Sequence, residues 1–249
     1  MKTSRWTAFL PYGLILLATL LSAFALALAT RWGPGVGGDA TIYMTCAQNL
    51  IKGQGLGLIG PQGEFRLLPY FPPFLSLVLS AIGLSGADML SAVRWLNILC
   101  FAGVVYLAGD STFRFGKSWF AALLVSILLG FSPVLIPVYS WAMSEPLSAF
   151  LGFSALVLVV YLLEKPDQRF LFIAAALLSG LSFLTRYAAL AFVLVDAAAI
   201  LLLMKRSWLE RFLKAFLFGL LAGIPMLIWL VYDVTHTATV GSRSMVTLA

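Results

Sequence analysis

The stretch FLPYGLILLATLLSAFALALAT (residues 9–30) decides the fold class, because it is a long apolar run without a charged side chain. A helix needs about 20 mainly apolar residues to cross a bilayer. Of the 249 residues, 61% are hydrophobic and only 10% are charged, whereas soluble domains carry about 25% charged residues. Too little polar surface remains to cover a water-exposed globule. The composition therefore predicts an all-α integral membrane protein.

Further apolar runs follow the first one. A polar break at Thr185-Arg186 divides the longest of them, because one helix over residues 170–204 would exceed the bilayer thickness. With the first span, this predicts about seven transmembrane helices, the later six at residues 89–108, 118–137, 143–163, 170–185, 187–204 and 212–233. The expected organisation is a single module with a first span (1–30), a large outer loop (31–87), spans two to seven (88–233) and an outer C-terminal tail (234–249).

The outer loop is rich in glycine and proline and is expected to hold juxtamembrane helices. Residues 39–52 have apolar positions spaced for one helical face. Residues 74–82, after Pro72-Pro73, are apolar but short, which favours an interfacial or re-entrant helix over a full crossing.

The distribution of basic residues orients the spans, because cytoplasmic loops carry an excess of Lys and Arg. With the N-terminus in the cytoplasm, ten of the 16 basic residues fall inside. These are Lys2, Arg5, Arg114, Lys117, Lys165, Arg169, Lys205, Arg206, Arg211 and Lys214. Counting residues 74–82 as a crossing would invert every later loop and place the last four outside. We therefore predict a multi-pass protein of the plasma (inner) membrane with its polar sites on the outer face.

Three polar residues on the outer side are candidates for function, and each has a structural alternative. Asp39 follows two glycines and is either a helix N-cap or a general base or cation ligand. Glu145 precedes Pro146 as at an ordinary helix start, yet an acid at a span end needs solvation or a partner. Arg186 is either an interfacial anchor or a phosphate clamp. Asp196, deeper in the next span, is unusual but has no evident partner.

Other function classes find little support. One histidine and two cysteines, Cys46 and Cys100, exclude a histidine-based zinc cluster. The net charge is +6, but the basic residues that give it lie mainly in the loops between apolar runs. We therefore expect no nucleic-acid partner. The GxGxxG match at residues 55–60 follows no strand and is expected to form turns.

Motifs in order along the chain resemble the GT-C superfamily of membrane glycosyltransferases, closest to the branch of protein O-mannosyltransferases and the lipid A aminoarabinose transferase. The first outer loop is matched by GDATIY (38–43), AQNL (47–50), GQG (53–55) and YFPPF (70–74). The later matches are AVRWLN (92–97), SP (132–133), SEPL (144–147), GLSFLTRY (180–187) and GSR (241–243).

The resemblance implies an inverting transferase that moves a sugar from a polyprenyl-phosphate donor to a lipid, glycan or protein acceptor at the outer face. It makes Asp39 the catalytic base and Glu145 a second acidic residue of the site. It assigns substrate binding to Tyr43, Pro73, Arg186 and Arg243. A divalent cation is a candidate cofactor, with Asp39 and Glu145 as candidate ligands.

Two features differ from the family pattern. Many relatives carry a second acid directly after the loop aspartate, where this chain has Ala40, which weakens a two-carboxylate metal site. Relatives also continue beyond the seventh span, whereas this sequence ends at Ala249. Two alternatives therefore stay open: an inactive truncated module that binds lipid-linked sugar, and a non-catalytic transport or scaffold protein. A membrane phosphatase or acyltransferase is disfavoured by the single histidine.

Overall fold

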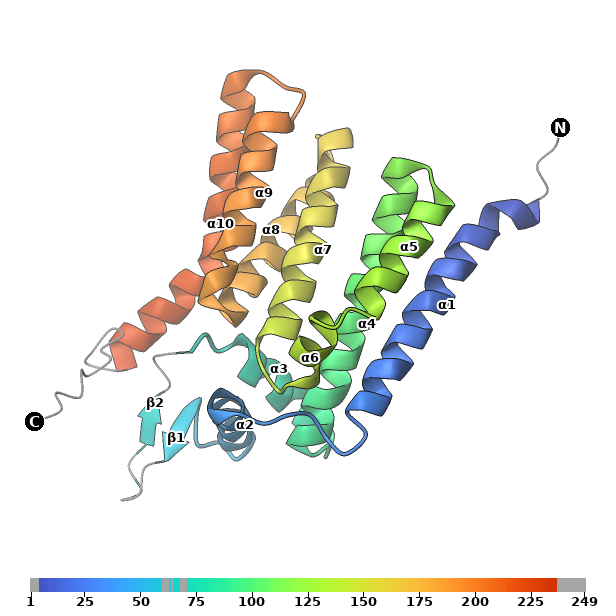
Figure 1. The fold of residues 1–249 in the computed structure, drawn as a ribbon. Coiled ribbons are helices and arrows are strands. Elements are labelled where there is room, and N and C mark those ends of the chain that lie inside the picture. Colours follow the sequence, from blue (N-terminus) through green and yellow to red (C-terminus); the bar gives the residue numbers. More distant parts are fainter. Residues whose placement is uncertain (1–4, 60–62, 64, 68–70, 237–249) are drawn as a thin grey trace, which may run out of the picture.

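The protein is a bundle of helices standing side by side, with short helices and a small hairpin gathered at one end (Figure 1). A computed structural model describes residues 5–59, 63, 65–67 and 71–236. Helices make up 79% of the chain, which confirms the predicted all-α class. The elements are, in order, α1 (Arg5–Ala29), α2 (Gly38–Ile51), β1 (Gly57–Ile59), β2 (Phe65–Leu67), α3 (Phe74–Gly83), α4 (Met89–Gly116), α5 (Trp119–Gly130), α6 (Leu135–Ser140), α7 (Glu145–Glu164), α8 (Arg169–Thr185), the 3-10 turn η1 (Tyr187–Ala189), α9 (Leu190–Leu203) and α10 (Trp208–His236).

Among the described residues, four helices are long and apolar enough to cross a membrane: Leu10–Ala29, Met89–Gly116, Glu145–Glu164 and Trp208–Thr235. Helices α5, α8 and α9 are apolar but shorter. The run expected at residues 118–137 is not one helix: α5 ends at Gly130, and Ser132-Pro133 precedes the separate α6. A proline has no N–H to continue the helical ladder, which explains the break.

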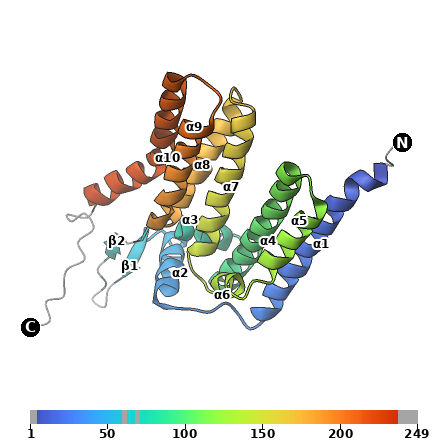
Figure 2. The same cartoon turned by 45° about the horizontal axis from the view of Figure 1, so that its top comes forward.

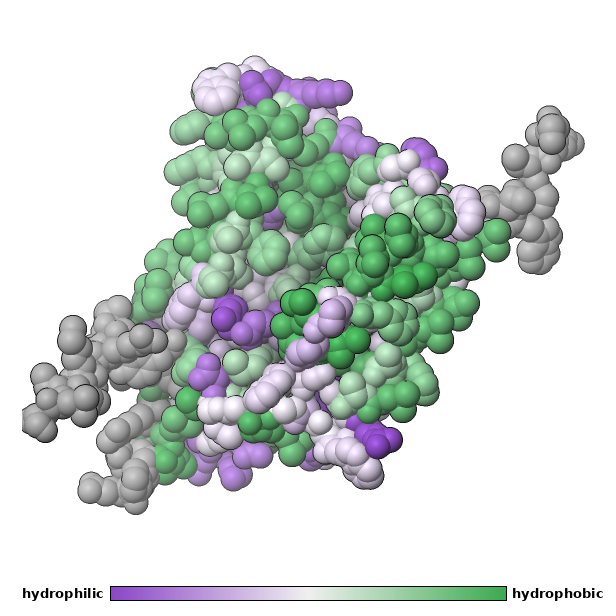
Figure 3. Space-filling view, viewed as in Figure 1, coloured by the Kyte–Doolittle hydropathy of each residue, from purple (hydrophilic) through white to green (hydrophobic). Residues whose placement is uncertain are grey.

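Apolar side chains cover the sides of the helices, and hydrophilic side chains gather toward the ends of the bundle (Figure 3). Large apolar side chains that are more than half exposed occur on α1, α9 and α10, among them Phe24, Leu194, Phe216 and Leu227. Such a surface is costly in water. It supports the membrane class read from the composition.

The helices form two groups, α1, α4 and α5 on one side and α7 to α10 on the other, as Figures 1 and 2 both show. The first group has a core around Phe101 and Val105, and the second has a core around Phe218 and Ile200. Helices α2, α3 and α6 lie toward the lower end of the bundle in Figure 1, beside the lower part of α4. That end holds the polar residues singled out from the sequence.

The first loop contains both helices that the sequence predicts, α2 for residues 39–52 and α3 for residues 74–82. It also contains a two-stranded antiparallel hairpin, β1–β2, which the sequence analysis did not predict. The Asn49 side-chain amide donates to the Gly57 carbonyl over 2.8 Å and ties the hairpin to α2. Gly53 and Gly55 adopt positive φ in the turn before β1. Of the GxGxxG glycines, Gly55 has the predicted turn role, Gly57 instead opens strand β1, and Gly60 lies outside the described residues.

Helix α10 changes direction along its length (Figure 1) and contains Pro225. A proline inside a helix removes one hydrogen bond and clashes with the preceding turn, so it bends the helix. The upper part of α10 packs on α8 and α9, while the part after the bend leans away from them. This bend places Trp229 beside α2 and the hairpin in a third apolar cluster.

We predict that Gly180→Ala loosens the packing of α8 on α10. A Cβ atom at Gly180 would lie 2.4 Å from the backbone oxygen of Ala222, so the two helices must separate. Small residues allow such close approach between apolar helices, and overpacking of this kind costs about 1–3 kcal/mol. Thermal unfolding of the detergent-purified protein should therefore shift to lower temperature.

Gly219→Ala is the matched control, because nothing lies within 4 Å of a Cβ atom at that position in α10. Alanine also has the higher helix propensity, so this variant should be as stable as the wild type or more so. Equal unfolding temperatures for both variants would show that the α8–α10 contact is not tight.

Candidate functional site

Hydrogen bonds between two serines fix the register of α7 against α8. The Ser182 hydroxyl donates to the Ser148 carbonyl over 2.8 Å, and the two hydroxyl oxygens lie 3.2 Å apart. Both side chains are buried. Because the helices are antiparallel, the residue one turn before Ser148 and the residue one turn after Ser182 come to face each other.

Those two residues are Glu145 and Arg186, and they form an ion pair. Arg186 Nη1 lies 2.9 Å from Glu145 Oε1. The same nitrogen lies 3.4 Å from the hydroxyl oxygen of Ser144. Arg186 can take this position because α8 ends at Thr185 and the chain is extended at Arg186 before the turn η1.

The ion pair is partly open to its surroundings, with 42% of the Arg186 side chain and 32% of the Glu145 side chain exposed. A pair with this exposure contributes at most about 1 kcal/mol to stability, because solvent screens it. Glu145 Oε2 is buried and has no hydrogen-bond partner among the described residues. The pair thus presents a partly exposed guanidinium group that a ligand could contact, whereas the second carboxylate oxygen of Glu145 is enclosed.

Helix α2 brings Asp39 and Tyr43 to the same place. The two residues are four apart, so they share one face of the helix. The Tyr43 hydroxyl donates to Ser144 Oγ over 3.4 Å, and Ser76 donates to the Tyr43 carbonyl over 3.1 Å, which links α2 to α3. Tyr43 is buried, whereas Asp39 is exposed.

The electrostatics of Tyr43 show which charges surround its hydroxyl. Burial raises the pKa of the phenol above its usual value, and the hydrogen bond with Ser144 lowers it. The charges of Asp39 and Glu145 also raise this pKa, and that of Arg186 lowers it. Tyr43 therefore stays protonated at neutral pH, and it lies within electrostatic reach of all three charged candidates.

The alternative role of Asp39 as an N-cap is wrong. Helix α2 begins at Gly38 with Gly37 as its cap, and no side chain caps its first turn. Asp39 lies inside that turn, where the helix dipole favours a negative charge. Among the described residues its carboxylate has no hydrogen bond or ion pair, so it is available to a ligand.

The segment before α7 is held by the first loop and by α4. Gly35 lies opposite Trp141 in a parallel bridge: its N–H donates to the Ser140 carbonyl and its carbonyl accepts from the Ala142 N–H, each over 2.8 Å. A Cβ atom at Gly35 would meet the Trp141 indole at 2.8 Å. Asn97 donates its side-chain amide to the carbonyls of Tyr139 and Trp141 over 3.2 and 2.7 Å. These contacts lead the chain from α6 directly to Ser144 and Glu145.

The structure thus brings together Tyr43, Glu145 and Arg186 around Ser144, and Asp39 lies one turn before Tyr43 on α2, close enough to raise the pKa of its hydroxyl. The other two predicted substrate-binding residues are not part of this group. Pro73 lines a separate groove, and Arg243 lies outside the described residues. Asp196 is fully buried in α9, without a hydrogen-bond partner for its carboxylate in the described chain, and is not in the site.

The groove at Pro73 has a volume of about 360 Å³ and is mostly apolar. It runs between the first loop and the part of α10 that follows the bend. Its lining includes Leu77, Leu184, Pro225 and Trp229. Leu184, at the end of α8, is the lining residue closest in sequence to Arg186.

A metal centre has weak support. Within the described ranges, no group of three or more His, Cys, Asp or Glu residues could hold a metal ion. Glu145 is also committed to Arg186, which leaves Asp39 as a lone carboxylate.

Sequence reasoning missed the residues that organise the site. Ser144 connects Tyr43 with Arg186, and Asn97 holds the segment before α7. Ser148 and Ser182 set the helix register. A polar side chain inside an apolar run was the available signal for Asn97 and for both serines.

Comparison with models of known protein families, with curated proteins and with solved structures finds no match to this chain.

We predict that Asn97→Leu destabilises the site end of the bundle. Leucine has a similar size but cannot donate, so the Tyr139 and Trp141 carbonyls lose their side-chain donor. An unsatisfied buried group costs about 1–3 kcal/mol. The unfolding temperature should fall, and hydrogen exchange of residues 139–144 should speed up. Exchange in this segment at the wild-type rate would mean that Asn97 does not hold it.

Proposed function

We propose that the chain crosses the membrane seven times, with α1, α4, α5, α7, α8, α9 and α10 as the spans and the N-terminus in the cytoplasm. Four of these helices have the required length and hydropathy, and the others are apolar and pack alongside them. Helix α8, with 17 residues, is about 26 Å long at 1.5 Å per residue. That is slightly shorter than the hydrocarbon core of about 30 Å, a mismatch that local thinning and long basic side chains can accommodate.

We further propose that the group at Asp39, Tyr43, Glu145 and Arg186 is the active site of a glycosyltransferase. Its donor is a sugar linked to a polyprenyl phosphate, and its acceptor is a hydroxyl group presented at the outer face. The observation that carries this proposal is the convergence of an unpaired carboxylate and a guanidinium from distant parts of the chain at one end of an apolar bundle. A lipid-linked phosphate lies at this depth of a membrane.

The residues support an inverting displacement. Asp39 accepts the proton of the acceptor hydroxyl as its oxygen attacks the anomeric carbon of the sugar. The bond between that carbon and the phosphate oxygen breaks, and the electron pair leaves with the polyprenyl phosphate. Arg186 stabilises the departing phosphate through charge-assisted hydrogen bonds. Glu145 holds Arg186 in position through their ion pair.

The apolar groove at Pro73 fits the prenyl chain of the donor in this proposal. It is lined mainly by apolar and aromatic side chains, among them Leu184 at the end of the helix that leads to Arg186. An amphiphilic donor would then lie with its phosphate at the guanidinium and its tail between the first loop and α10. The proposed proton transfer to Asp39 and the departure of the phosphate at Arg186 are written without a metal ion. A cation held between Asp39 and the donor phosphate is compatible with both.

The proposed topology predicts the labelling of single cysteines placed in a variant that lacks Cys46 and Cys100. Gln54→Cys and Ser85→Cys lie on either side of α3, and both should react with an impermeant maleimide added to intact cells. Lys165→Cys, in the α7–α8 turn, should react only after permeabilisation. Protection of Ser85→Cys with labelling of Gln54→Cys would mean that α3 crosses the membrane.

The proposed activity predicts sugar transfer in membranes supplied with a panel of radiolabelled polyprenyl-phosphate sugars. Asp39→Asn should lower the rate about 10²–10⁴-fold, the usual contribution of a general base. Arg186→Gln should weaken use of the donor by roughly 10–100-fold, because hydrogen bonds to a charged group are lost. Asp88→Asn is the matched control: Asp88 is an exposed acid that caps α4, and asparagine caps equally well.

The outcomes of this assay test the enzyme class and the roles of individual residues separately. Transfer at the wild-type rate by Asp39→Asn would exclude Asp39 as the base while leaving the class intact. No transfer by wild-type protein that is folded and inserted would contradict the enzyme and favour a non-catalytic binder. Binding of polyprenyl phosphate that depends on Arg186 would then distinguish a lipid-linked-sugar module from a scaffold protein.

A further inference from the structure

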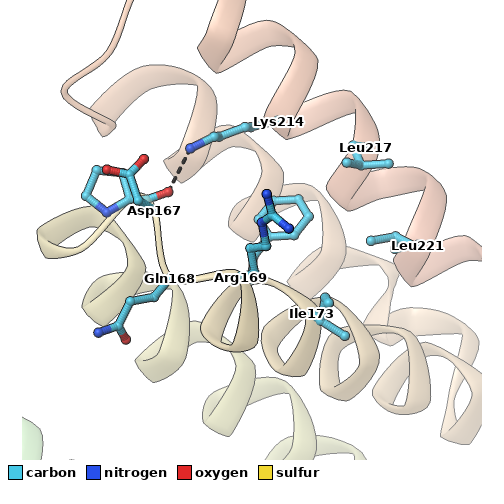
Figure 4. Close-up of a pocket in the computed structure, with 9 residues that line it drawn as sticks. Asp167, Gln168, Arg169, Ile173, Lys214, Leu217 and Leu221 are labelled. Atoms are coloured by element: carbon cyan, nitrogen blue, oxygen red, sulfur yellow. Dashed lines mark hydrogen bonds between the residues drawn. The ribbon is translucent and has the colours of Figure 1, made fainter.

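A second groove lies at the opposite end of the bundle from Asp39, between α8 and α10 (Figure 4). Its volume is about 590 Å³. The turn that joins α7 to α8 forms its mouth, and α8 and α10 form its walls. It is separate from the proposed active site and from the groove at Pro73.

The lining of this groove is divided into a charged mouth and an apolar wall. Arg169 and Lys214 lie at the mouth, where Figure 4 shows them extending into the space between the two helices. The wall below them consists of Phe172, Ile173, Leu217 and Leu221. Lys214, Leu217 and Leu221 follow one stripe of α10, over a length of about 10 Å at 1.5 Å per residue.

The two cations at the mouth are free to bind an anion. Arg169 is exposed and has no hydrogen bond or ion pair within the described part of the chain. Lys214 donates one hydrogen bond, to the Pro166 carbonyl over 2.7 Å, and an ammonium group has two further donors. Asp167, an acid that also lines the groove, is paired with Arg206.

The surrounding turns add to the positive field. Residues 164–169 and 203–214 together carry six basic and three acidic side chains. Basic pockets between transmembrane helices on the cytoplasmic side are suited to phospholipid headgroups. The mouth therefore favours an anion, and the apolar wall favours an aliphatic chain attached to it.

We infer that this groove binds one anionic phospholipid, with its phosphate at Arg169 and Lys214 and one acyl chain against Ile173, Leu217 and Leu221. A soluble phosphate would use only the mouth and leave the apolar wall uncovered. A zwitterionic lipid would bring a positive group to a mouth that is already positive. The inference depends on membrane insertion but not on sugar transfer.

The test is native mass spectrometry of the detergent-purified chain incubated with phosphatidylglycerol or with phosphatidylcholine of the same acyl chains. The wild-type protein should retain one phosphatidylglycerol in preference to phosphatidylcholine. Arg169→Gln breaks no described contact and should weaken this retention about fivefold, the effect of one basic residue at a lipid surface. Leu217→Trp fills the groove and should weaken retention of both lipids.

Lys165→Gln is the matched control, because Lys165 lies in the same turn but does not line the groove. It removes only part of the surrounding positive field, so it should weaken retention of phosphatidylglycerol less than Arg169→Gln does. Equal retention of the two lipids by the wild type, or an equal loss in Lys165→Gln and Arg169→Gln, would overturn the inference. So would displacement of the lipid by excess inorganic phosphate, which would mean that the mouth recognises the anion alone.

Discussion

The hydrogen bonds between Ser148 and Ser182 set the alignment of α7 and α8, and the geometry of the charged group follows from that alignment. In an apolar bundle most helix contacts allow sliding, because one aliphatic side chain packs nearly as well as another. A buried hydroxyl needs a partner at a defined height, so this pair excludes shifted registers. Glu145 and Arg186 then face each other without any further constraint, although their own attraction is too screened to hold them there.

A second constraint acts on the loops. Backbone groups that leave a helix must find partners, especially where little water is available. The first loop and the segment before α7 satisfy each other through Gly35 and Trp141, and Asn97 takes up two of the remaining carbonyls. The Tyr43 hydroxyl of α2 consequently lies against Ser144 at the start of α7, although 101 residues separate them. The need of backbone N–H and C=O groups for hydrogen-bond partners therefore positions the charged group as much as the attraction between its side chains does.

Composition and periodicity were sufficient to predict the helical class, most helix positions and the two helices of the first loop. The reason is that each signal was local: an apolar run, a proline pair or a charge at a helix end. The convergence of Asp39, Glu145 and Arg186 was predictable only as far as topology placed them on one face. Their contacts were not, because they depend on Ser144, Asn97 and the serine pair, which are isolated polar residues in apolar runs.

The hairpin was missed because three-residue strands carry too little periodicity to be recognised. The break between α5 and α6 at Ser132-Pro133 was not predicted, because the apolar run of residues 118–137 predicts one helix despite its proline.

The bend of α10 at Pro225 has a consequence for communication across the bilayer. On one side of the bend the helix lines the groove at Lys214, and on the other side it lines the groove at Trp229. A change in bend angle alters both cavities at once. If a ligand in either groove prefers one angle, it changes the affinity of the other groove by the same factor in both directions, because linkage between two sites is reciprocal. A single proline thus links the two grooves in which we propose an anionic phospholipid and the prenyl chain of the donor.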